Sequence, residues 1–511
     1  MKILKAHSNA TIEKRSLNSL FANIIQFTVQ ILQSIILVPV LLHYWGDEKY
    51  GVWLAVFSFF TLLQTFDAGH QTYVGNEFNK YFHIDKLKAK EILGSSIRAC
   101  LIIGLFELII LTLIIVFNFT PSFVGITAES SKDLGVEWGL ISIMLVWILS
   151  GNVGGVLVRI ILPLGMMSRS IYLGTILKVI QILILLLSGI LRLSIFEACL
   201  YTALSSLFYS YGLFIYIRYL MPDFYPWWSG GNWKTGFLNL KRSTVLTFTN
   251  LLEQFSNSGL ILVITNFLNA AFVPVFTTIR TLGNTALQGT GMILNPLYPD
   301  MVRYHATNEP KKLLNLFEVN WLVTGFVVNS AFILSLLFIE PLYTWWTKGL
   351  LKFDLALYSL IVSSVVISNF SKGFNVYLAS INHLRALTVI TTSKFTVIAL
   401  FGISLISLLN LRSLGLALLL SEIVALYFSF RFTKMTLNKC GEDFNYFILN
   451  LNFIALAVTL IVFIFNYFNL FDRLVLTLTG IILLLFIYLK LFNLLSQLVK
   501  NRIFNLLHLN F

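Results

Sequence analysis

The sequence predicts an all-α membrane protein of about 14 transmembrane helices, with two six-helix lobes around a central cavity and two C-terminal helices. Of its 511 residues, 57% are hydrophobic and 12% charged, about half the charged share of a soluble protein. Apolar runs of about 20 residues, long enough to cross the hydrocarbon of a bilayer, recur along the whole chain. Lysine and arginine gather in alternate short loops, as in multi-pass membrane proteins.

The apolar runs can be placed in order as fourteen spans, with short hairpin turns near residues 192 and 382. The spans are 17–43, 50–68, 90–118, 138–158, 171–191, 195–219, 242–266, 271–298, 315–339, 355–380, 384–409, 413–433, 446–468 and 473–495. We expect an N-terminal lobe at 1–220, a cytoplasmic linker at 221–241 and a C-terminal lobe at 242–433. Residues 434–511 supply the two additional helices and a cytoplasmic tail.

The distribution of basic residues predicts the orientation of these spans. With the N-terminus inside, the inner segments hold 24 of the 36 lysines and arginines, the outer segments hold seven, and five lie within spans. This is the positive-inside pattern, so we expect both termini to be cytoplasmic. It also accounts for the net charge of +13 without nucleic acid as a partner. The longest outer loop (119–137) and inner loop (220–241) are too short to hold a folded domain.

Several kinds of chemistry have no motif in the chain. There is no Gly-x-x-x-x-Gly-Lys-Ser/Thr loop for ATP, no His-Glu-x-x-His, and no Gly-x-Ser-x-Gly with a plausible triad. The three cysteines fit neither a disulfide framework nor a metal site. We therefore expect a protein that is not an enzyme and uses no metal or cofactor.

Polar residues form stripes on the predicted spans. Four amides of the first span share one helix face by their spacing of three and four residues: Asn23, Gln26, Gln30 and Gln33. Because an amide is costly in hydrocarbon, this face is either interhelical glue or the wall of a wet cavity. The seventh span has a similar stripe: Asn250, Glu253, Gln254 and Asn257. The second span ends in Gln64, Asp67 and Gln71, and the eighth carries Thr277, Arg280, Thr281, Asn284 and Gln288. These matches indicate a parallel repeat of two lobes.

Charged residues within spans are rare and mark functional positions in membrane proteins. The basic ones are Arg98, Lys178, Arg280, Lys372 and Lys394, and the acidic ones include Asp67, Glu107, Glu253 and Glu422. At 1.5 Å per residue, Arg280 lies about 13 Å from the outer surface and Glu253 about 16 Å deep, whereas the other four basic side chains can snorkel to the cytoplasmic surface. Arg280 and Glu253 either neutralise each other or line a functional cavity. The two alternatives are compatible, because a transporter can break such an ion pair when its substrate binds.

Two motifs resemble those of bacterial polysaccharide flippases, including the O-antigen flippases of the multidrug/oligosaccharidyl-lipid/polysaccharide (MOP) exporter superfamily. One is Pro39 near the outer end of the first span, then Gly46-Asp-Glu-Lys-Tyr50-Gly51 in the turn and Asp67-Ala-Gly69 after it. The other is Asn295-Pro296-Leu-Tyr-Pro299. The family has about twelve spans, whereas the related lipid II flippases have fourteen, and His70 departs from the usual apolar residue.

The resemblance implies a flippase of a bacterial inner (plasma) membrane. It would move an undecaprenyl-diphosphate-linked oligosaccharide, an O-antigen or similar surface polysaccharide unit of the lipopolysaccharide type, to the outer leaflet by alternating access. Membrane lipids surround it, and a polysaccharide polymerase and a chain-length regulator are implied partners.

On this hypothesis, the cations attract the diphosphate and the amides bind sugars. The expected substrate-binding residues are Arg280, Lys178, Arg98, Lys372, Lys394, Asn250, Asn284, Gln26 and Gln30. Glu253 or Asp67 would couple to an ion or form a lobe contact. A drug exporter of the same superfamily would want a predominantly acidic cavity, a polysaccharide polymerase would want a large outer loop, and a purely structural protein would not need the polar stripes.

Overall fold

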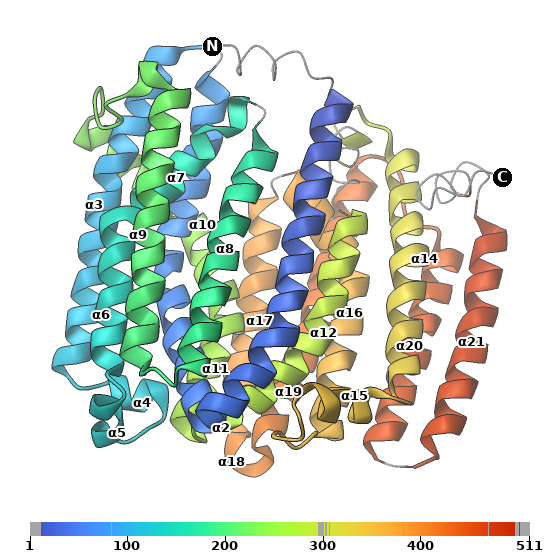
Figure 1. Cartoon of the computed structure of the whole chain (residues 1–511). Helices are drawn as coiled ribbons and strands as arrows, with labels where there is room; N and C mark the ends of the chain where they lie inside the picture. Colours follow the sequence, from blue (N-terminus) through green and yellow to red (C-terminus); the bar gives the residue numbers. More distant parts are fainter. Residues whose placement is uncertain are drawn as a thin grey trace. The chain divides into compact units, whose positions relative to one another are not determined.

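The computed structural model describes residues 12–82, 84–164, 166–294, 301, 304–305, 307–381, 383–468, 470–495 and 500, and these are organised as helices joined by turns (Figure 1). By their contacts the residues form two compact units, unit 1 (Met1–Pro274) and unit 2 (Val275–Phe511). Within the described residues, each of the fourteen predicted spans falls on a helix. The predicted fold class is therefore confirmed.

Unit 1 contains the helices of the first seven predicted spans. They are α2 (Ile12–Phe82), α3 (Lys86–Val116), α6 (Val136–Val146) with α7 (Asn152–Ile160), α8 (Met167–Ile190), α9 (Ile195–Leu220), and α10 (Trp233–Gln254) with α11 (Leu260–Phe267). A π-helical turn joins each split pair: η1 (Trp147–Gly151) and η4 (Phe255–Gly259). Two short helices, α4 (Thr120–Val124) and α5 (Ala128–Asp133), fill the longest predicted outer loop.

Unit 2 contains the remaining spans, and α12 (Phe272–Leu294) starts at the boundary between the units. The others are α14 (Pro310–Ser335), α16 (Leu355–Ser380), α17 (Leu384–Ser404) with the short α18 (Ile406–Leu409), α19 (Leu411–Lys439), α20 (Tyr446–Tyr467) and α21 (Arg473–Leu494). A short helix, α15 (Ile339–Trp346), follows α14.

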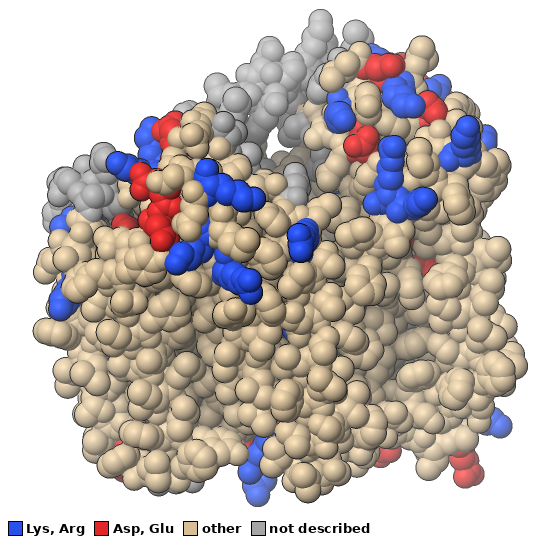
Figure 2. All heavy atoms as spheres, turned by 180° about the vertical axis from the view of Figure 1, so that it is seen from behind, with Lys and Arg blue, Asp and Glu red and all other residues tan. Residues whose placement is uncertain are grey.

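Eleven of the described helices are long and apolar enough to cross a membrane, so this is a multi-pass membrane protein. One of them, α2, holds the first two predicted spans. The spans at 242–266 and 271–298 are helical as well, but they are not among the eleven. Their polar stripes explain this, because amides, hydroxyls and Arg280 lower the mean hydropathy of α10 and α12. On the face in Figure 2, most lysines and arginines lie at one end, and a band with very few charged side chains separates them from the few at the other.

The kink in α2 is the predicted outer turn. Gly46 has φ 76° and ψ 175° there, a conformation that a residue without Cβ adopts freely. The second half of α2 continues to Phe82, although the sequence predicted a span ending at 68. Asp67 therefore lies inside a helix, not at its end. The helix is longer because polar residues after Gln71 still form backbone hydrogen bonds beyond the apolar stretch.

The predicted linker at 221–241 is bound closely to α3. Gly231 lies so near the backbone of α3 that a Cβ would come within 2.1 Å of the Gly94 carbonyl carbon. The Asn232 amide donates to Ser95 Oγ at 3.0 Å, and its side chain donates to Glu91 at 3.0 Å. The start of α10 is thereby fixed to α3, and contacts place α10 and α11 in unit 1. The division into lobes at 220 and 242 stays a prediction.

The two additional helices are integral to unit 2. Tyr488 of α21 accepts a hydrogen bond from Asn329 of α14 at 3.0 Å, and Asn466 of α20 donates to Ser359 of α16 at 3.2 Å. A cavity of about 10 Å³, about the space that one water occupies, is lined by residues of α14, α16, α20 and α21, most of them amides, hydroxyls and rings. In a membrane, where apolar surface gives no net drive for association, such polar contacts hold helices together.

Candidate functional site

Two of the predicted basic site residues of unit 2, Arg280 and Lys372, meet at one face of α12. Arg280, Asn284 and Leu287 follow one another at i, i+4 and i+7, so they lie on the same side of the helix. Arg280 is half-buried, and its guanidinium lies 5.9 Å from the ring centre of Phe276. On the adjoining side, Gly283 packs against Val365 and Ile361 of α16. That packing fixes how α12 is rotated, and with it the direction of the Arg280 face.

Lys372 of α16 reaches this face. Its Nζ donates to the Leu287 carbonyl at 2.6 Å and to Thr290 Oγ1 at 3.4 Å. Gly291 leaves room for the ammonium, because a Cβ there would come within 3.2 Å of Nζ. No carboxylate among the described residues pairs with Lys372, so its positive charge is not cancelled. The structure thus brings Arg280, Asn284 and the Lys372 ammonium to one helix face, which we call the α12 cationic face.

Lys394 lies in a different environment. Its Nζ is 2.5 Å from Glu422 Oε1 of α19, and the two side chains are 29% and 11% exposed. Glu422 also interacts electrostatically with Arg280. The sequence predicted that Lys394 attracts phosphate and indicated no partner for it. A neutralised lysine attracts an anion less strongly than the uncompensated Lys372.

Removing Glu422 is expected to destabilise unit 2. In the Glu422→Gln variant, the half-buried Lys394 loses its counter-ion, which we expect to cost about 3 kcal/mol, at the low end for a buried pair because Lys394 is partly exposed. The midpoint of thermal unfolding in detergent should fall. The double variant Lys394→Met/Glu422→Leu should recover most of the loss, since no lone charge remains. An unchanged midpoint for Glu422→Gln alone would show that the pair is not structural.

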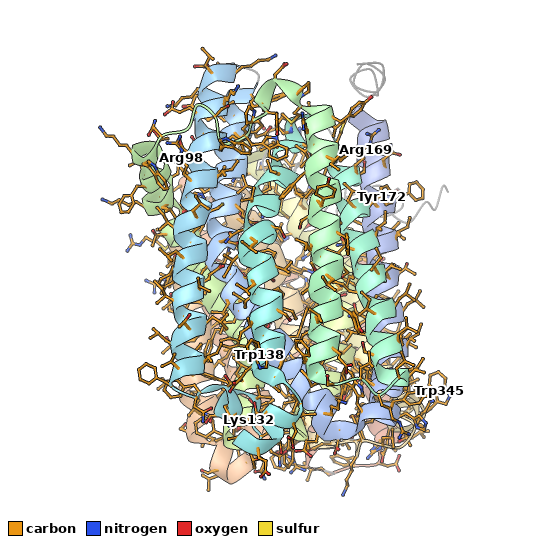
Figure 3. The ribbon with its side chains drawn as sticks, turned by 60° about the vertical axis from the view of Figure 1, so that its left-hand side comes forward. Arg98, Lys132, Trp138, Arg169, Tyr172 and Trp345 are labelled. Carbon is orange, nitrogen blue, oxygen red and sulfur yellow. The ribbon has the colours of Figure 1, made fainter. Side chains whose placement is uncertain are left out.

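The two predicted basic site residues of unit 1, Arg98 and Lys178, lie on different helices. Arg98 of α3 is half-buried, with its guanidinium 5.8 Å from the ring centre of Trp233. It lies at the same end of unit 1 as Arg169, opposite Lys132 and Trp138 (Figure 3). Lys178 of α8 is half-buried and has no ion-pair partner among the described residues.

The amide stripe of the first span lies on the less exposed side of α2. Its four members are half-buried, namely Asn23, Gln26, Gln30 and Gln33, whereas exposed apolar residues lie between and just after them: Ile24, Ile25, Leu32, Ile35 and Ile36. A stripe turned away from lipid would show this distribution. The assignment of Gln26 and Gln30 to substrate binding stays a prediction.

The stripe of the seventh span is partly structural. Gln254 donates to Ser258 Oγ at 2.7 Å, and Ser258 is 3.1 Å from Thr61 Oγ1 of α2. These bonds connect η4 to α2, as interhelical glue does. Asn250 is half-buried and Glu253 is exposed. The pairing of Glu253 with Arg280 would lie between the units and stays a prediction, and the motif at 295–299 lies outside the described residues.

Asp67 lies in a buried polar cluster of unit 1 whose other members were not among the predicted site residues. Asp67 is 1% exposed, accepts a hydrogen bond from Gln71 at 2.8 Å, and interacts electrostatically with Arg159 of α7. Glu107 of α3 is completely buried and accepts a hydrogen bond from Asn152 of α7 at 3.4 Å. The sequence did indicate Glu107 as an acidic residue inside the third span. It could not indicate its partner, because Asn152 lies 45 residues away in the sequence.

Glycines on α7 and α2 make this cluster possible. A Cβ on Gly155 would lie 2.3 Å from the Gln71 Nε2, and one on Gly75 would lie 2.9 Å from the Arg159 Cβ. Small residues let transmembrane helices approach closely enough for polar side chains to meet. Among the described residues, no group of three or more His, Cys, Asp or Glu could hold a metal ion.

Solved structures with this fold are transporters and a flippase. A MATE family multidrug resistance transporter of the MOP superfamily, inward-facing, superposes with a TM-score of 0.58 at 16% identity over 82% of this chain and 99% of its own. The lipid II flippase MurJ, inward closed, gives 0.57 at 14% identity over 93% and 97%. A eukaryotic MATE transporter gives 0.55 at 12% identity over 84% and 98%. No protein-family model matches the chain, and no curated protein matches it.

Proposed function

We propose that the protein is a flippase that moves an undecaprenyl-diphosphate-linked oligosaccharide from the cytoplasmic to the outer leaflet by alternating access. The α12 cationic face carries the proposal. A guanidinium, an amide and an uncompensated ammonium on one helix face match a substrate with a diphosphate and sugars, because a diphosphate needs cations and sugars need amides.

The fold supports the same reading at a coarser level. It is shared with MATE transporters and with a lipid II flippase, and at this identity the likeness concerns the fold alone. MurJ matches over the largest share of this chain of the three structures compared, 93%.

The second candidate is a drug exporter, which the MATE likeness equally allows. One observation in unit 1 favours it, namely the buried acids Asp67 and Glu107. Acidic residues are what a cationic drug would need. They are 1% and 0% exposed, however, so a bulky cation could not reach them without a large rearrangement.

The test is transport in vesicles. The purified full chain is reconstituted with a lipid-linked oligosaccharide, and a membrane-impermeant glycosidase reports how much lies in the outer leaflet. Protein-dependent exposure of the sugar supports the flippase. Export of a lipophilic cation without exposure of the sugar would replace this proposal with the drug exporter.

A deletion strain provides an independent measurement. We expect unpolymerised lipid-linked units to accumulate on the cytoplasmic side of the membrane. Normal display of surface polysaccharide in that strain would contradict the proposed substrate.

A further inference from the structure

Glu107 is a carboxyl group buried in a membrane bundle without a cation. Its side chain is completely buried. Oε2 accepts a weak hydrogen bond from Asn152 Nδ2 at 3.4 Å, and Oε1 has no hydrogen-bond partner among the described residues. No basic side chain of the described part of the chain pairs with it. A bare carboxylate in such a place would cost several kcal/mol or more, so Glu107 must hold something positive.

The local geometry is built around this group. Asn152 is the first residue after the π-helical turn η1, and it is completely buried with Oδ1 unpartnered. π-helical turns within α-helices occur frequently at functional sites. On α3, one turn before Glu107, a Cβ on Gly104 would lie 3.6 Å from Asn152 Nδ2. Gly104 therefore lets α7 approach α3. Asn152 Oδ1 is thus a second buried acceptor, besides Glu107 Oε1, that lacks a donor among the described residues.

Within the described residues, the basic side chain that interacts with this cluster pairs with the other acid. Arg159 interacts electrostatically with Asp67, and Asp67 in turn interacts with Glu107. Of the two buried acids, only Asp67 interacts with this half-buried arginine. The amides of Gln71 and Asn152 donate, but they add no charge. The described residues therefore place no positive charge next to the Glu107 carboxyl group.

The other ionisable groups around the cluster do not supply it. His70 of α2 is completely buried, with Nδ1 3.5 Å from Ser243 Oγ of α10. The Cys100 thiol on α3 donates to the Asn152 backbone carbonyl at 3.9 Å and adds no positive charge. The basic residues of α10 at this end, Lys241 and Arg242, are exposed. Glu137 lies in the first turn of α6, and η1 has no ionisable residue.

We propose that Glu107, Asn152 and Asp67 form a proton-binding site inside unit 1, and that Glu107 carries the proton in this conformation. The protonated carboxyl has an O–H donor, and the unpaired Asn152 Oδ1 is the acceptor that lacks a donor. When the site opens to water, the proton passes to water and leaves a carboxylate that can be solvated. Buried acids with this behaviour are proton relays in membrane transporters.

We further infer that this proton couples transport to the pH gradient, a step that rests on the proposed function. A protonated Glu107 permits the closed packing of α3 against α7, whereas the carboxylate would favour a hydrated arrangement. Each transport cycle would then move a proton along with the change of conformation. The binding site itself does not depend on what is transported.

The site is tested by infrared spectroscopy and by chemical labelling of the purified full chain in lipid nanodiscs. The carbonyl-stretch band of a protonated carboxylic acid should be present in the wild type and lost in Glu107→Gln. A hydrophobic carbodiimide, which attacks protonated carboxyls, should label Glu107 as shown by peptide mapping. Labelling should fall about tenfold per pH unit on the alkaline side of the titration. The exposed Glu129→Gln on α5 is the matched control and should change neither signal.

Three results would overturn the site. Glu107 is ionised if the wild type shows no such band and no label at this residue. It holds a metal cation if sodium ions block labelling at constant pH. The band belongs to another acid if Glu107→Gln retains it. Peptide mapping of the wild type identifies Glu107 directly, so the test stands even if the variant does not fold.

Coupling has a separate readout in the vesicle assay. Glutamine resembles the protonated acid, so Glu107→Gln should fold and bind substrate but lose the response of sugar exposure to an imposed pH gradient. An unchanged response would remove the coupling step. If the wild type shows the infrared band but never exposes sugar, the proposed function fails and the proton site remains.

Discussion

Replacing Arg280 with alanine is expected to reduce transport of the lipid-linked substrate about 10- to 100-fold, whereas Arg280→Lys should keep part of it. A charge-assisted hydrogen bond contributes about 1.5–3 kcal/mol, which corresponds to that range of rates. Lysine keeps the charge but not the planar fork that binds a phosphate through two parallel bonds. The measurement is sugar exposure in vesicles with equal amounts of folded protein.

The alanine variant is expected to fold. Glu422, which interacts with Arg280, keeps its ion pair with Lys394, so no lone carboxylate results. The matched control is Arg431→Ala, which removes an exposed arginine of α19 and should leave transport unchanged. Wild-type transport by Arg280→Ala would show that the substrate does not bind the α12 cationic face.

The course of the spans could be predicted because it depends on one strong signal. A membrane helix needs a long apolar run, and the sign of the loop charges distinguishes inner from outer segments. The helix ends were less predictable. The second half of α2 runs to Phe82 because backbone hydrogen bonds continue beyond the hydrocarbon, where hydropathy no longer reports them.

Side-chain pairing in the site could not be predicted, because it depends on distant segments. Lys372 was assigned to the cytoplasmic mouth from its depth, but a depth estimate could not show that its ammonium lies at the Leu287 carbonyl. Lys394 and Glu422 were both identified as charges within spans, and nothing in their spacing of 28 residues predicts their contact. Helical periodicity gives the face of a residue but not the identity of the helix opposite.

The glycines of the N-terminal motif illustrate the same limit. Gly46 is a turn residue with positive φ, and a Cβ there would meet nothing within 4 Å. Gly51 and Gly69 have a different reason, which the sequence did not show. A Cβ on Gly51 would lie 1.9 Å from the Ala270 carbonyl oxygen, and one on Gly69 would lie 2.3 Å from the Thr247 nitrogen. Both glycines therefore let α2 touch the backbone of the segment formed by α10, α11 and the turn after it.

Replacing either glycine with alanine is accordingly expected to cause a large loss of stability in unit 1. Overpacking a core usually costs about 1–3 kcal/mol and sometimes more. We expect about 3 kcal/mol or more for Gly51→Ala and Gly69→Ala, because the obstructing atoms belong to backbone and cannot rotate away. Thermal unfolding in detergent should show a lower midpoint, and less protein should elute as a single species in size-exclusion chromatography.

Two other helical glycines provide the controls. A Cβ on Gly174 of α8 or Gly212 of α9 would meet nothing within 4 Å. Gly174→Ala and Gly212→Ala should be neutral or raise the midpoint slightly, since alanine favours a helix by about 1 kcal/mol over glycine. If Gly51→Ala and Gly69→Ala behave like these controls, then α2 does not pack directly on the backbone of this segment. If only the two α2 variants are destabilised, the motif glycines serve to let two helices pack closely and do not act as flexible joints.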